Sequence, residues 1–461
     1  MFKKIQIVYL IGIGGIGMSA LAKYFLLHNK KVYGYDLNIS DNTKTLEQLG
    51  AIIHYNDKPQ VIKELINKNN IENILIIYTP AIPKTSNILK WLNEKNICIF
   101  KRSEILREIC NNYKYTIAVA GTHGKTTTSS LLAHILNNST HLCCAFLGGI
   151  LKNYNSNFIF NENTDYIVVE ADEYDRSFLH LNSYASIITA VDPDHLDIYG
   201  NYENLKDAFQ QFTNKIKPNG KLLIKKPIAF TPKIDENIHI LTYSIKNINA
   251  DCYINNVSII NGFYKFDIIT PFETINDIQP KILGLHNLEN ILAAASMALW
   301  LGVNKNVIKS AIENFSGIKR RFDVQINNNH FTLIDDYAHH PEEIKATICS
   351  IKELFPSKKM TVIFQPHLYS RTKDLATEFA EALNLADEIC LLPIFPAREE
   401  KIEGVTSKLI YDKIKNSNKH LIEENQLLNY IKSKKPELII TMGAGDVNKF
   451  IEPIKNILNE I

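Results

Sequence analysis

The chain has 461 residues, 45% of them hydrophobic and 22% charged, which is typical of a globular protein with buried cores. At ordinary domain sizes this length favours about three domains. Lys and Arg together number 51 and Asp and Glu number 49, a near-balance that excludes a nucleic-acid binder relying on bulk positive charge. Small anionic substrates remain compatible with it, because they need only a few local cations.

The cysteines and the N-terminal stretch indicate the cellular compartment of the protein. The seven cysteines include no CxxC pair and no zinc-like spacing with histidine, which indicates a reducing compartment. The opening "MFKKIQIVYLIGIGGIGMSALA" has the lysines and apolar run of a signal peptide, but its glycines fit a strand-to-helix turn better. No stretch reaches the roughly 18 apolar residues of a membrane span. We therefore expect a cytoplasmic protein without membrane insertion.

A glycine-rich turn follows the first predicted strand, "IQIVYLI", and leads into a predicted helix, "MSALAKYFLLHN". Gly12, Gly14, Gly15 and Gly17 match the fingerprint of a dinucleotide site, and Asp36 ends the next strand, "KVYGYD". Such a loop binds a diphosphate, and a carboxylate at that place binds ribose hydroxyls. Taken alone the pattern favours NAD, but a UDP-sugar carries the same groups.

Strands and helices then alternate in three blocks, which predicts an α/β protein with parallel sheets covered by helices. The later strands of the first block are "NILIIYTPAI" and "ICIFKR", and the second block contains "YTIAVAG", "DYIVVEADE" and "SIITAVDPDH". Short alternating runs between about Lys221 and Pro280 predict a small antiparallel patch. The third block has "FTLIDDYAHHP", "MTVIFQPH", "EICLLPIF" and "ELIITMGAGD". We place the domain boundaries at 1–111, 112–317 and 318–461.

A second glycine loop, "GTHGKTTT", also follows a strand and precedes a helix, which is the context of a P-loop. Backbone N–H groups of such a loop bind phosphate oxygens, Lys125 reaches the terminal phosphates, and the Thr126 hydroxyl binds Mg²⁺. Val119 departs from the first glycine of the longer motif, and the alternative is a glycine turn that merely caps a helix. The residues expected at the nucleotide are Gly121, Thr122, His123, Gly124, Lys125, Thr126 and Thr127.

Two further side chains stand at or just beyond predicted strand ends. Glu170 ends "YIVVE", and His195 comes just after "SIITAV" in "DPDH". Ligands of open parallel sheets bind beyond the carboxyl ends of the strands, so both side chains are candidate Mg²⁺ ligands. The alternatives are a plain surface glutamate and a hydrogen-bonded loop histidine, and magnesium prefers oxygen ligands to imidazole.

The motifs "GIGGIGM", "GTHGKTTT", "EADEYDRSFL", "DPDHLD", "GLHNLEN", "RRFD", "DDYAHHP" and "QPHLYSRT" occur in this order over most of the chain. Together they resemble the Mur ligase family of cell-wall synthesis, in its branch that acts on UDP-muramic acid. The resemblance implies a Rossmann-like N-terminal domain that binds the UDP substrate. It further implies a central P-loop ATPase domain and a Rossmann-like C-terminal ligase domain that closes on ATP and the amino acid.

The resemblance also implies roles for individual residues. Asn287 and Asn290 would contact the adenine side of ATP, although Asn287 is also explained as a helix cap. Arg321 would meet ATP from the hinge. Tyr337 and His339, with Arg371, would contact the phosphates and the muramoyl substrate.

Two features depart from patterns of the wider family. Leu368 replaces an arginine that many relatives carry in this motif, which leaves Arg371 as the remaining cation. Several sister ligases use a carbamylated lysine after the "DH" motif, but Gln210 and Gln211 stand near that spacing here, which fits the alanine-adding branch.

The reaction that the resemblance implies is ATP-dependent ligation of L-alanine to the lactyl carboxylate of UDP-N-acetylmuramate through an acyl phosphate. Lys125, His195, His339 and Arg371 are the expected catalytic residues, and ATP with Mg²⁺ the expected cofactors. We expect a monomer or weak homodimer with no nucleic-acid partner. Three alternatives remain: a recycling ligase that adds a tripeptide to the same substrate, an NAD-dependent oxidoreductase, and a non-catalytic nucleotide-binding module.

Overall fold

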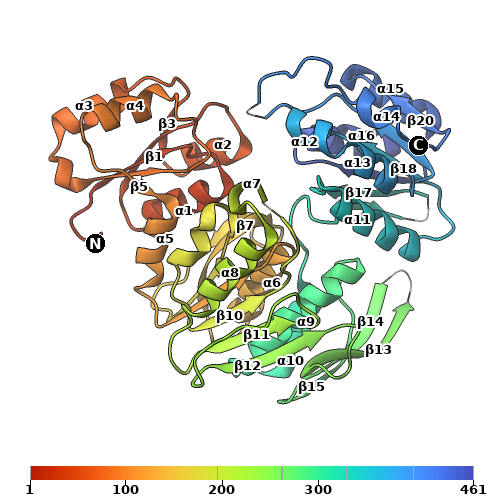
Figure 1. Cartoon of the computed structure of the whole chain (residues 1–461), viewed down its shortest axis with the longest axis horizontal. Helices are drawn as coiled ribbons and strands as arrows, with labels where there is room; N and C mark the ends of the chain where they lie inside the picture. The colour runs from red at the N-terminus through yellow and green to blue at the C-terminus, as the bar shows by residue number, and fades with distance from the viewer. Residues whose placement is uncertain (1, 195, 261–262, 329, 398, 460–461) are drawn as a thin grey trace. The chain divides into compact units, whose positions relative to one another are not determined.

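The computed structural model describes residues 2–194, 196–260, 263–328, 330–397 and 399–459. Its strands form three sheets, each accompanied by helices (Figure 1). The chain divides into two compact units. The first contains Met1–Val257, Phe266–Ile278 and Glu289–Phe315, and the second contains Ser258–Lys265, Gln279–Leu288 and Ser316–Ile461.

The N-terminal sheet has five parallel strands in the order β3-β2-β1-β4-β5. Its strands are β1 (Ile7–Ile11), β2 (Lys31–Tyr35), β3 (Ile52–His54), β4 (Ile74–Tyr78) and β5 (Phe100–Lys101). Its helices are α1 (Ile16–Leu27), α2 (Asp41–Gln48), α3 (Gln60–Lys68), α4 (Asn87–Glu94) and α5 (Arg102–Cys110), with the 3₁₀ turn η1 (Ile71–Asn73). From β1 the chain continues to β2 and β3 on one side, and it then crosses to β4 and β5 on the other side of β1. The first glycine loop, at the end of β1, therefore stands at the switch point, where such sheets bind ligands.

The second sheet has ten strands in the order β15-β14-β13-β12-β11-β10-β6-β9-β7-β8. They are β6 (Tyr115–Ala120), β7 (Cys143–Leu151), β8 (Ser156–Ile159), β9 (Tyr166–Glu170), β10 (Ala185–Ile188), β11 (Lys221–Lys225), β12 (His239–Ser244), β13 (Cys252–Ile260), β14 (Phe263–Ile269) and β15 (Thr274–Ile278). The associated helices are α6 (Lys125–Asn137), α7 (Leu196–Tyr199), α8 (Tyr202–Thr213), α9 (Leu285–Trp300) and α10 (Lys305–Asn314), with η2 (Tyr174–His180). β6, which leads into the P-loop, is central and buried between β10 and β9.

The predicted antiparallel patch is present but smaller than the sequence suggested. β14 and β15 pair antiparallel. β11 and β12, which belong to the same stretch of sequence, instead run parallel to β10 and continue the main sheet. The central residues of β11 are apolar and buried, as is typical of parallel strands, whereas the clear alternation of buried and half-buried residues begins later, in β14.

The third sheet has six strands in the order β16-β17-β21-β18-β19-β20, of which the pair β16–β17 is antiparallel and the other pairs are parallel. The strands are β16 (Asp323–Asn327), β17 (Thr332–Asp336), β18 (Met360–Phe364), β19 (Glu388–Leu391), β20 (Lys419–Leu421) and β21 (Leu438–Met442). The helices are α11 (Pro341–Leu354), α12 (Tyr369–Asp374), α13 (Ala376–Leu383), α14 (Lys408–Tyr411), α15 (Glu424–Lys434) and α16 (Ile451–Asn459), with η3 (Val447–Phe450).

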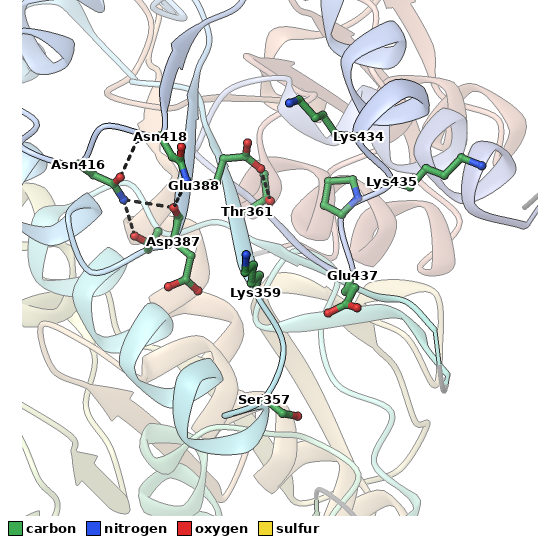
Figure 2. Close-up of a pocket in the computed structure, with 12 residues that line it drawn as sticks. Ser357, Lys359, Thr361, Asp387, Glu388, Asn416, Asn418, Lys434, Lys435 and Glu437 are labelled. Carbon is green, nitrogen blue, oxygen red and sulfur yellow. Dashed lines mark hydrogen bonds between the residues drawn. The ribbon is translucent and has the colours of Figure 1, made fainter.

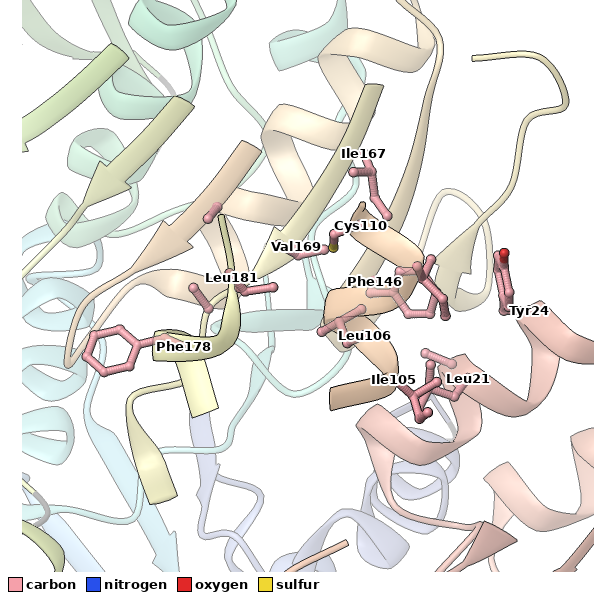
Figure 3. Packing of buried hydrophobic residues seen from close by; sticks show 14 of the residues in the cluster. Leu21, Tyr24, Ile105, Leu106, Cys110, Phe146, Ile167, Val169, Phe178 and Leu181 are labelled. Atoms are coloured by element: carbon pink, nitrogen blue, oxygen red, sulfur yellow. The ribbon is translucent and has the colours of Figure 1, made fainter. Parts of the chain in front are cut away.

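A shared hydrophobic core joins the N-terminal and central domains within the first unit. Leu21 and Tyr24 of α1 and Ile105 of α5 belong to the same buried cluster as Phe146 of β7 (Figure 3). The rings of Tyr24 and Phe146 lie 5.8 Å apart. Burying these large side chains stabilises the contact by roughly 1.5–3 kcal/mol each. The two glycine loops therefore belong to one packed body.

The predicted fold class, a three-domain α/β protein with parallel sheets, is confirmed. The boundaries at 111/112 and 317/318 stay predictions. Within the described ranges, every helix is too short or too polar to cross a lipid bilayer.

Candidate active site

The first glycine loop is a tight turn in which most backbone groups are already bonded. Gly12 has φ +83°, and a Cβ there would lie 2.7 Å from Thr79 Cγ2, so glycine is required. The N–H groups of Gly12 and Ile13 donate to the carbonyl of Tyr35, and that of Gly15 donates to Gly12.

Asp36 binds this loop in the structure. Its Oδ2 accepts a hydrogen bond of 2.7 Å from the Gly14 N–H, and its Oδ1 accepts one of 3.3 Å from Asn38 N–H. The carboxylate thus holds the turn from the end of β2. Its predicted contact with ribose hydroxyls stays a prediction.

The donors that the loop leaves open lie in the first turn of α1. Gly15 is its N-cap and makes no side-chain cap bond. Among the described residues, no acceptor lies within hydrogen-bond distance of the N–H groups of Ile16, Gly17 and Met18. These groups are the positive end of the helix, which suits a bound anion.

The P-loop also begins its helix without a side-chain cap. Gly124 is the N-cap of α6 with φ +79°, and a Cβ there would lie 2.5 Å from Asn290 Oδ1. Gly121 has φ +137° and leaves no room for a Cβ beside Thr189. No described residue accepts from the N–H groups of Lys125–Thr127, so the second loop offers the same kind of anion site as the first.

Lys125 carries a positive charge inside this loop. Its Nζ donates to the Gly121 carbonyl at 2.7 Å and lies 2.8 Å from both carboxylate oxygens of Glu173, which is fully buried. Burial by itself lowers the pKa of the ammonium, but the carboxylates of Glu173, Asp172 and Glu170 outweigh it and raise that pKa above its usual value. Lys125 is therefore charged throughout the physiological pH range.

Thr126 and Glu170 form an oxygen pair next to this lysine. The Thr126 hydroxyl donates to Glu170 Oε1 at 3.1 Å, and the Gly148 N–H donates to Glu170 Oε2 at 2.9 Å. Hydroxyl and carboxylate oxygens are the ligands that Mg²⁺ prefers, so this pair fits a magnesium ion. The third predicted ligand, His195, lies outside the described residues, within which no three His, Cys, Asp or Glu side chains are placed so that they could hold a metal ion by themselves.

Other predicted nucleotide residues surround the same loop. The Thr122 hydroxyl accepts from Asp192 N–H at 3.1 Å, and His123 Nε2 lies 3.9 Å from Asp192 Oδ2. Thr127 follows in the first turn of α6. Asn290 accepts from the Thr128 hydroxyl at 3.1 Å, so its amide is bonded to the helix that follows the P-loop.

Asn287 lies in the second unit. It is inside the first turn of α9, and its amide donates to the Leu283 carbonyl at 2.7 Å. It therefore does not occupy the N-cap position of α9.

The predicted C-terminal residues lie at the carboxyl ends of strands in the second unit. Tyr337 follows β17, and the guanidinium groups of Arg320 and Arg321 each lie 5.1 Å from its ring centroid. Arg320 also donates to the carbonyls of Gly445 (2.8 Å) and Gly443 (2.5 Å), so it ties this region to the end of β21. Arg321 makes no such backbone bond among the described residues, which leaves its donors for a ligand.

His339 and Arg371 lie in the same unit. The Nδ1 atom of His339 lies 2.9 Å from the Tyr337 carbonyl, and a carbonyl only accepts, so Nδ1 carries the hydrogen and Nε2 is the acceptor. Burial, with a smaller contribution from Arg371, lowers the pKa of this imidazole. Arg371 has a buried Nη1 that donates to no atom of the described residues.

Leu368, the departure noted in the sequence, precedes α12 with φ +72° and ψ 138°. This conformation is rare for a residue with a side chain and typical of functional turns. Its carbonyl accepts from the Thr372 hydroxyl at 2.7 Å, and this bond holds the helix that carries Arg371.

A separate cavity of about 850 Å³ is present in the C-terminal domain (Figure 2). It is lined by residues at or before the start of strands, such as Lys359, Glu388 and Glu437, and so lies at the opposite edge of the sheet from Tyr337. Its polar groups bond one another, for example Thr361 with Glu388 at 2.8 Å. It is not part of the predicted site.

Sequence reasoning missed the partners that hold the predicted residues. Glu173 stands three positions after Glu170 in the same acidic motif, but nothing in the spacing told which carboxylate meets the lysine. Arg320 and Arg321 are adjacent and identical in type. Only the structure shows that Arg320 donates to backbone carbonyls, whereas the guanidinium of Arg321 does not among the described residues. A sequence motif gives the residue types, but the fold determines which residues contact one another.

Comparisons with known proteins identify the family of the chain. Three family models match: "Mur ligase family, catalytic domain" over residues 7–114, "Mur ligase middle domain" over 119–298, and "Mur ligase, glutamate ligase domain" over 320–445. A UDP-N-acetylmuramate–L-alanine ligase from Parabacteroides distasonis is 45% identical over 455 residues, covering 99% of this chain and 98% of that protein. One from Flavobacterium psychrophilum is 44% identical and covers 99% of both.

Solved structures show the same fold. The UDP-N-acetylmuramate-alanine ligase of Thermotoga maritima superposes with a TM-score of 0.81 at 26% identity, covering 98% of this chain and 99% of that one. A murein peptide ligase from Psychrobacter arcticus gives a TM-score of 0.70 at 21% identity, with 99% of each chain covered, and at that identity it shows the fold alone.

Proposed function

The chain belongs to the Mur ligase family, and we propose that it joins L-alanine to the lactyl carboxylate of UDP-N-acetylmuramate, using ATP, in peptidoglycan precursor synthesis. The near full-length relatives carry this activity in their names. The observation that carries the proposal is the pair of glycine loops in one unit, the second with Lys125 beside the Thr126–Glu170 oxygen pair. A dehydrogenase has no use for that second loop.

The first step activates a poor electrophile. A carboxylate resists attack by an amine because oxide is a very poor leaving group, so a lactyl carboxylate oxygen first attacks the γ-phosphorus of ATP and ADP leaves. The free N–H groups of Lys125, Thr126 and Thr127 bind the triphosphate, and the Lys125 ammonium stabilises the charge that develops on the transferred group. Glu173 keeps that ammonium charged and fixed against the loop.

The second step forms the amide. The alanine nitrogen attacks the acyl carbon, and the tetrahedral intermediate expels phosphate. Arg371 stabilises the anionic intermediate through its guanidinium, whose Nη1 is buried and donates to no atom of the described residues. His339 has a lowered pKa and is neutral at pH 7, so it acts through hydrogen bonds rather than as a fixed cation. Its Nε2 is free to accept a proton.

Thr126 and Glu170, together with His195, would hold Mg²⁺. When bound, the ion neutralises phosphate charge and orients the γ-phosphate. The donor oxygens of the first two residues fit that role.

The remaining predicted contacts are assigned to each unit by itself. Gly12, Gly14, Gly15 and Gly17 shape the loop that receives the diphosphate of the UDP substrate, with Asp36 holding it. In the second unit, Tyr337 and Arg321 contact ATP or the muramoyl group, with Asn287 on the adenine side. We further infer a cytoplasmic location, since the seven cysteines are all free thiols. A monomer or weak homodimer stays a prediction.

The test is phosphate release from ATP with UDP-N-acetylmuramate present. Adding L-alanine should start turnover, and adding the tripeptide L-alanyl-γ-D-glutamyl-diaminopimelate should not. Turnover with the tripeptide alone would replace the proposal by the recycling reaction. NAD reduction without phosphate release would overturn it altogether.

A further inference from the structure

The first glycine loop lacks a charged side chain of its own. Its N–H groups at Gly12–Gly15 donate to the carbonyls of Tyr35 and Gly12 or to Asp36, which leaves those of Ile16, Gly17 and Met18 as open donors among the described residues. A diphosphate carries two or more negative charges, and neutral N–H groups in a half-buried site balance them only in part. A bound diphosphate therefore requires a cation close to Gly17.

Arg102 lies directly against this helix terminus. An ideal Cβ built on Gly17 would be 2.6 Å from Arg102 Nη1 and 3.1 Å from its Cζ and Cδ. Glycine at position 17 is therefore what lets the guanidinium lie beside the open N–H groups. The arginine is the first residue of α5, far from Gly17 in sequence.

The position of this guanidinium is set by the core beneath it. Ile105 and Leu106, one turn further along α5, pack in the same buried cluster as Leu21 of α1 (Figure 3). The two helices are thus packed together through side chains that are at most 6% exposed. A rigid base of this kind places a binding group with little loss of conformational entropy on binding.

The guanidinium has only a weak anionic partner. Among the described residues, its ion pair is with Asp172, whose Oδ2 lies 3.8 Å from Nη2, and it makes no hydrogen bond. The two side chains are 22% and 40% exposed, and such long, solvated pairs contribute little to stability. The planar fork of donors is therefore available for bidentate contact with phosphate oxygens.

We propose that Arg102 binds the diphosphate of the UDP substrate, together with the N–H groups of Ile16–Met18. On binding, the guanidinium exchanges Asp172 for phosphate oxygens. This inference rests on the proposed function and adds to it the side-chain cation of the first loop.

The test is calorimetric titration with UDP, UMP and uridine. Arg102→Gln should weaken UDP binding about 10- to 100-fold, the range of a charge-assisted contact, weaken UMP binding less, and leave uridine binding unchanged. Lys101→Gln is the matched control. Lys101 is the neighbouring cation, pairs with Asp175 at 3.3 Å, and should leave UDP affinity within about twofold of wild type.

Asp172→Asn distinguishes binding from a purely structural role. If Arg102 binds phosphate, removing its competing carboxylate raises UDP affinity, and an unchanged affinity contradicts the inference. If Arg102 acts only by pairing with Asp172, this variant loses affinity as Arg102→Gln does, and the inference is overturned. The outcome of Asp172→Asn decides the matter even if Arg102→Gln fails to fold, which loss of ATP-analogue binding would reveal.

The two proposals fail in different ways. Wild-type protein that binds no UDP would contradict the proposed function. Wild-type protein that binds UDP with the same affinity as folded Arg102→Gln would contradict only the role of Arg102.

Discussion

The two glycine loops have the same backbone arrangement but differ in the charged side chains near them. Each follows a buried parallel strand, turns through glycines with positive φ, and starts a helix with no side-chain cap. The P-loop adds a lysine within its own sequence and an adjacent threonine–glutamate pair. The described residues of the first loop, 12–17, contain no charged side chain, and the cation beside Gly17, Arg102, comes from another helix.

This difference explains how one chain distinguishes two nucleotides. A triphosphate that transfers its terminal group needs a fixed cation and oxygen ligands for a metal. A diphosphate that only anchors a sugar needs backbone donors and one neutralising side chain. The glycines alone serve both purposes, so they do not identify the ligand.

The largest effect is expected from removing the lysine of the second loop. Lys125→Met should lower the rate of ligation at least about 100-fold, while UDP binding at the first loop stays unchanged. Because Glu173 is fully buried, loss of its lysine also destabilises the fold by an estimated ~3 kcal/mol or more.

The double variant Lys125→Met/Glu173→Gln removes that buried charge and should restore thermal stability but not activity. Phosphate-release assays and thermal unfolding measure the two effects. Activity restored in the double variant would mean that the lysine only neutralises Glu173.

A substitution in the first glycine loop should have the opposite selectivity, weakening the binding of the UDP substrate and not that of ATP. A side chain at position 14 would meet Asp36 Oδ2 at 2.9 Å and Thr43 Cγ2 at 2.8 Å. Gly14→Val should therefore displace the turn and weaken binding of UDP-N-acetylmuramate by roughly 10- to 100-fold, the equivalent of 1–3 kcal/mol of overpacking. Binding of an ATP analogue should stay normal. Calorimetry with both ligands checks this, and equal losses for both would show that the loops are not separate sites.

A smaller effect is expected at the oxygen pair. Glu170→Gln keeps the shape of the side chain but removes the charge, and its amide oxygen can accept from the Gly148 N–H while its NH₂ group donates to the Thr126 hydroxyl. The Mg²⁺ concentration for half-maximal activity should rise about 5- to 10-fold, with the maximal rate largely recovered at high Mg²⁺. Arg102→Gln is the contrasting control, because it should leave the magnesium requirement unchanged. An unaltered requirement in Glu170→Gln would make Glu170 structural.

The smallest effect concerns stability in acid. His134 on α6 is buried, and burial lowers its pKa to about 4. The unfolded chain, with a histidine pKa of about 6.5, therefore binds more protons between these values, so stability falls as pH drops below about 6.5. The expected loss is about 1 kcal/mol at pH 5.5 relative to pH 7.5. Denaturant unfolding of wild type and His134→Gln measures it, and an equal pH dependence in both would exclude His134 as its source.

The sequence predicted the strand-ending motifs well because each one is local. Buried strands such as β1, β6 and β9 read as apolar runs, and the loops after them carry glycine or acid. It could not predict contacts between distant segments. The bond of Asp36 to Gly14 was not foreseen, and Arg102 and Glu173 were not singled out, because the sheet order and the packing of α1 on α5 decide these neighbours. The backbone conformation of Leu368 could not be predicted either, since leucine does not favour a positive φ.

The central claim is that the two loops bind different nucleotides at the same time, and competition titration tests it most directly. UDP-N-acetylmuramate is titrated into wild-type protein that is already saturated with Mg²⁺ and a non-hydrolysable ATP analogue, and into the same protein with NAD. We predict that one UDP substrate binds per chain in both cases and that NAD neither binds at micromolar concentration nor competes. Displacement of the ATP analogue by the UDP substrate, or micromolar NAD binding that the UDP substrate abolishes, would contradict the account.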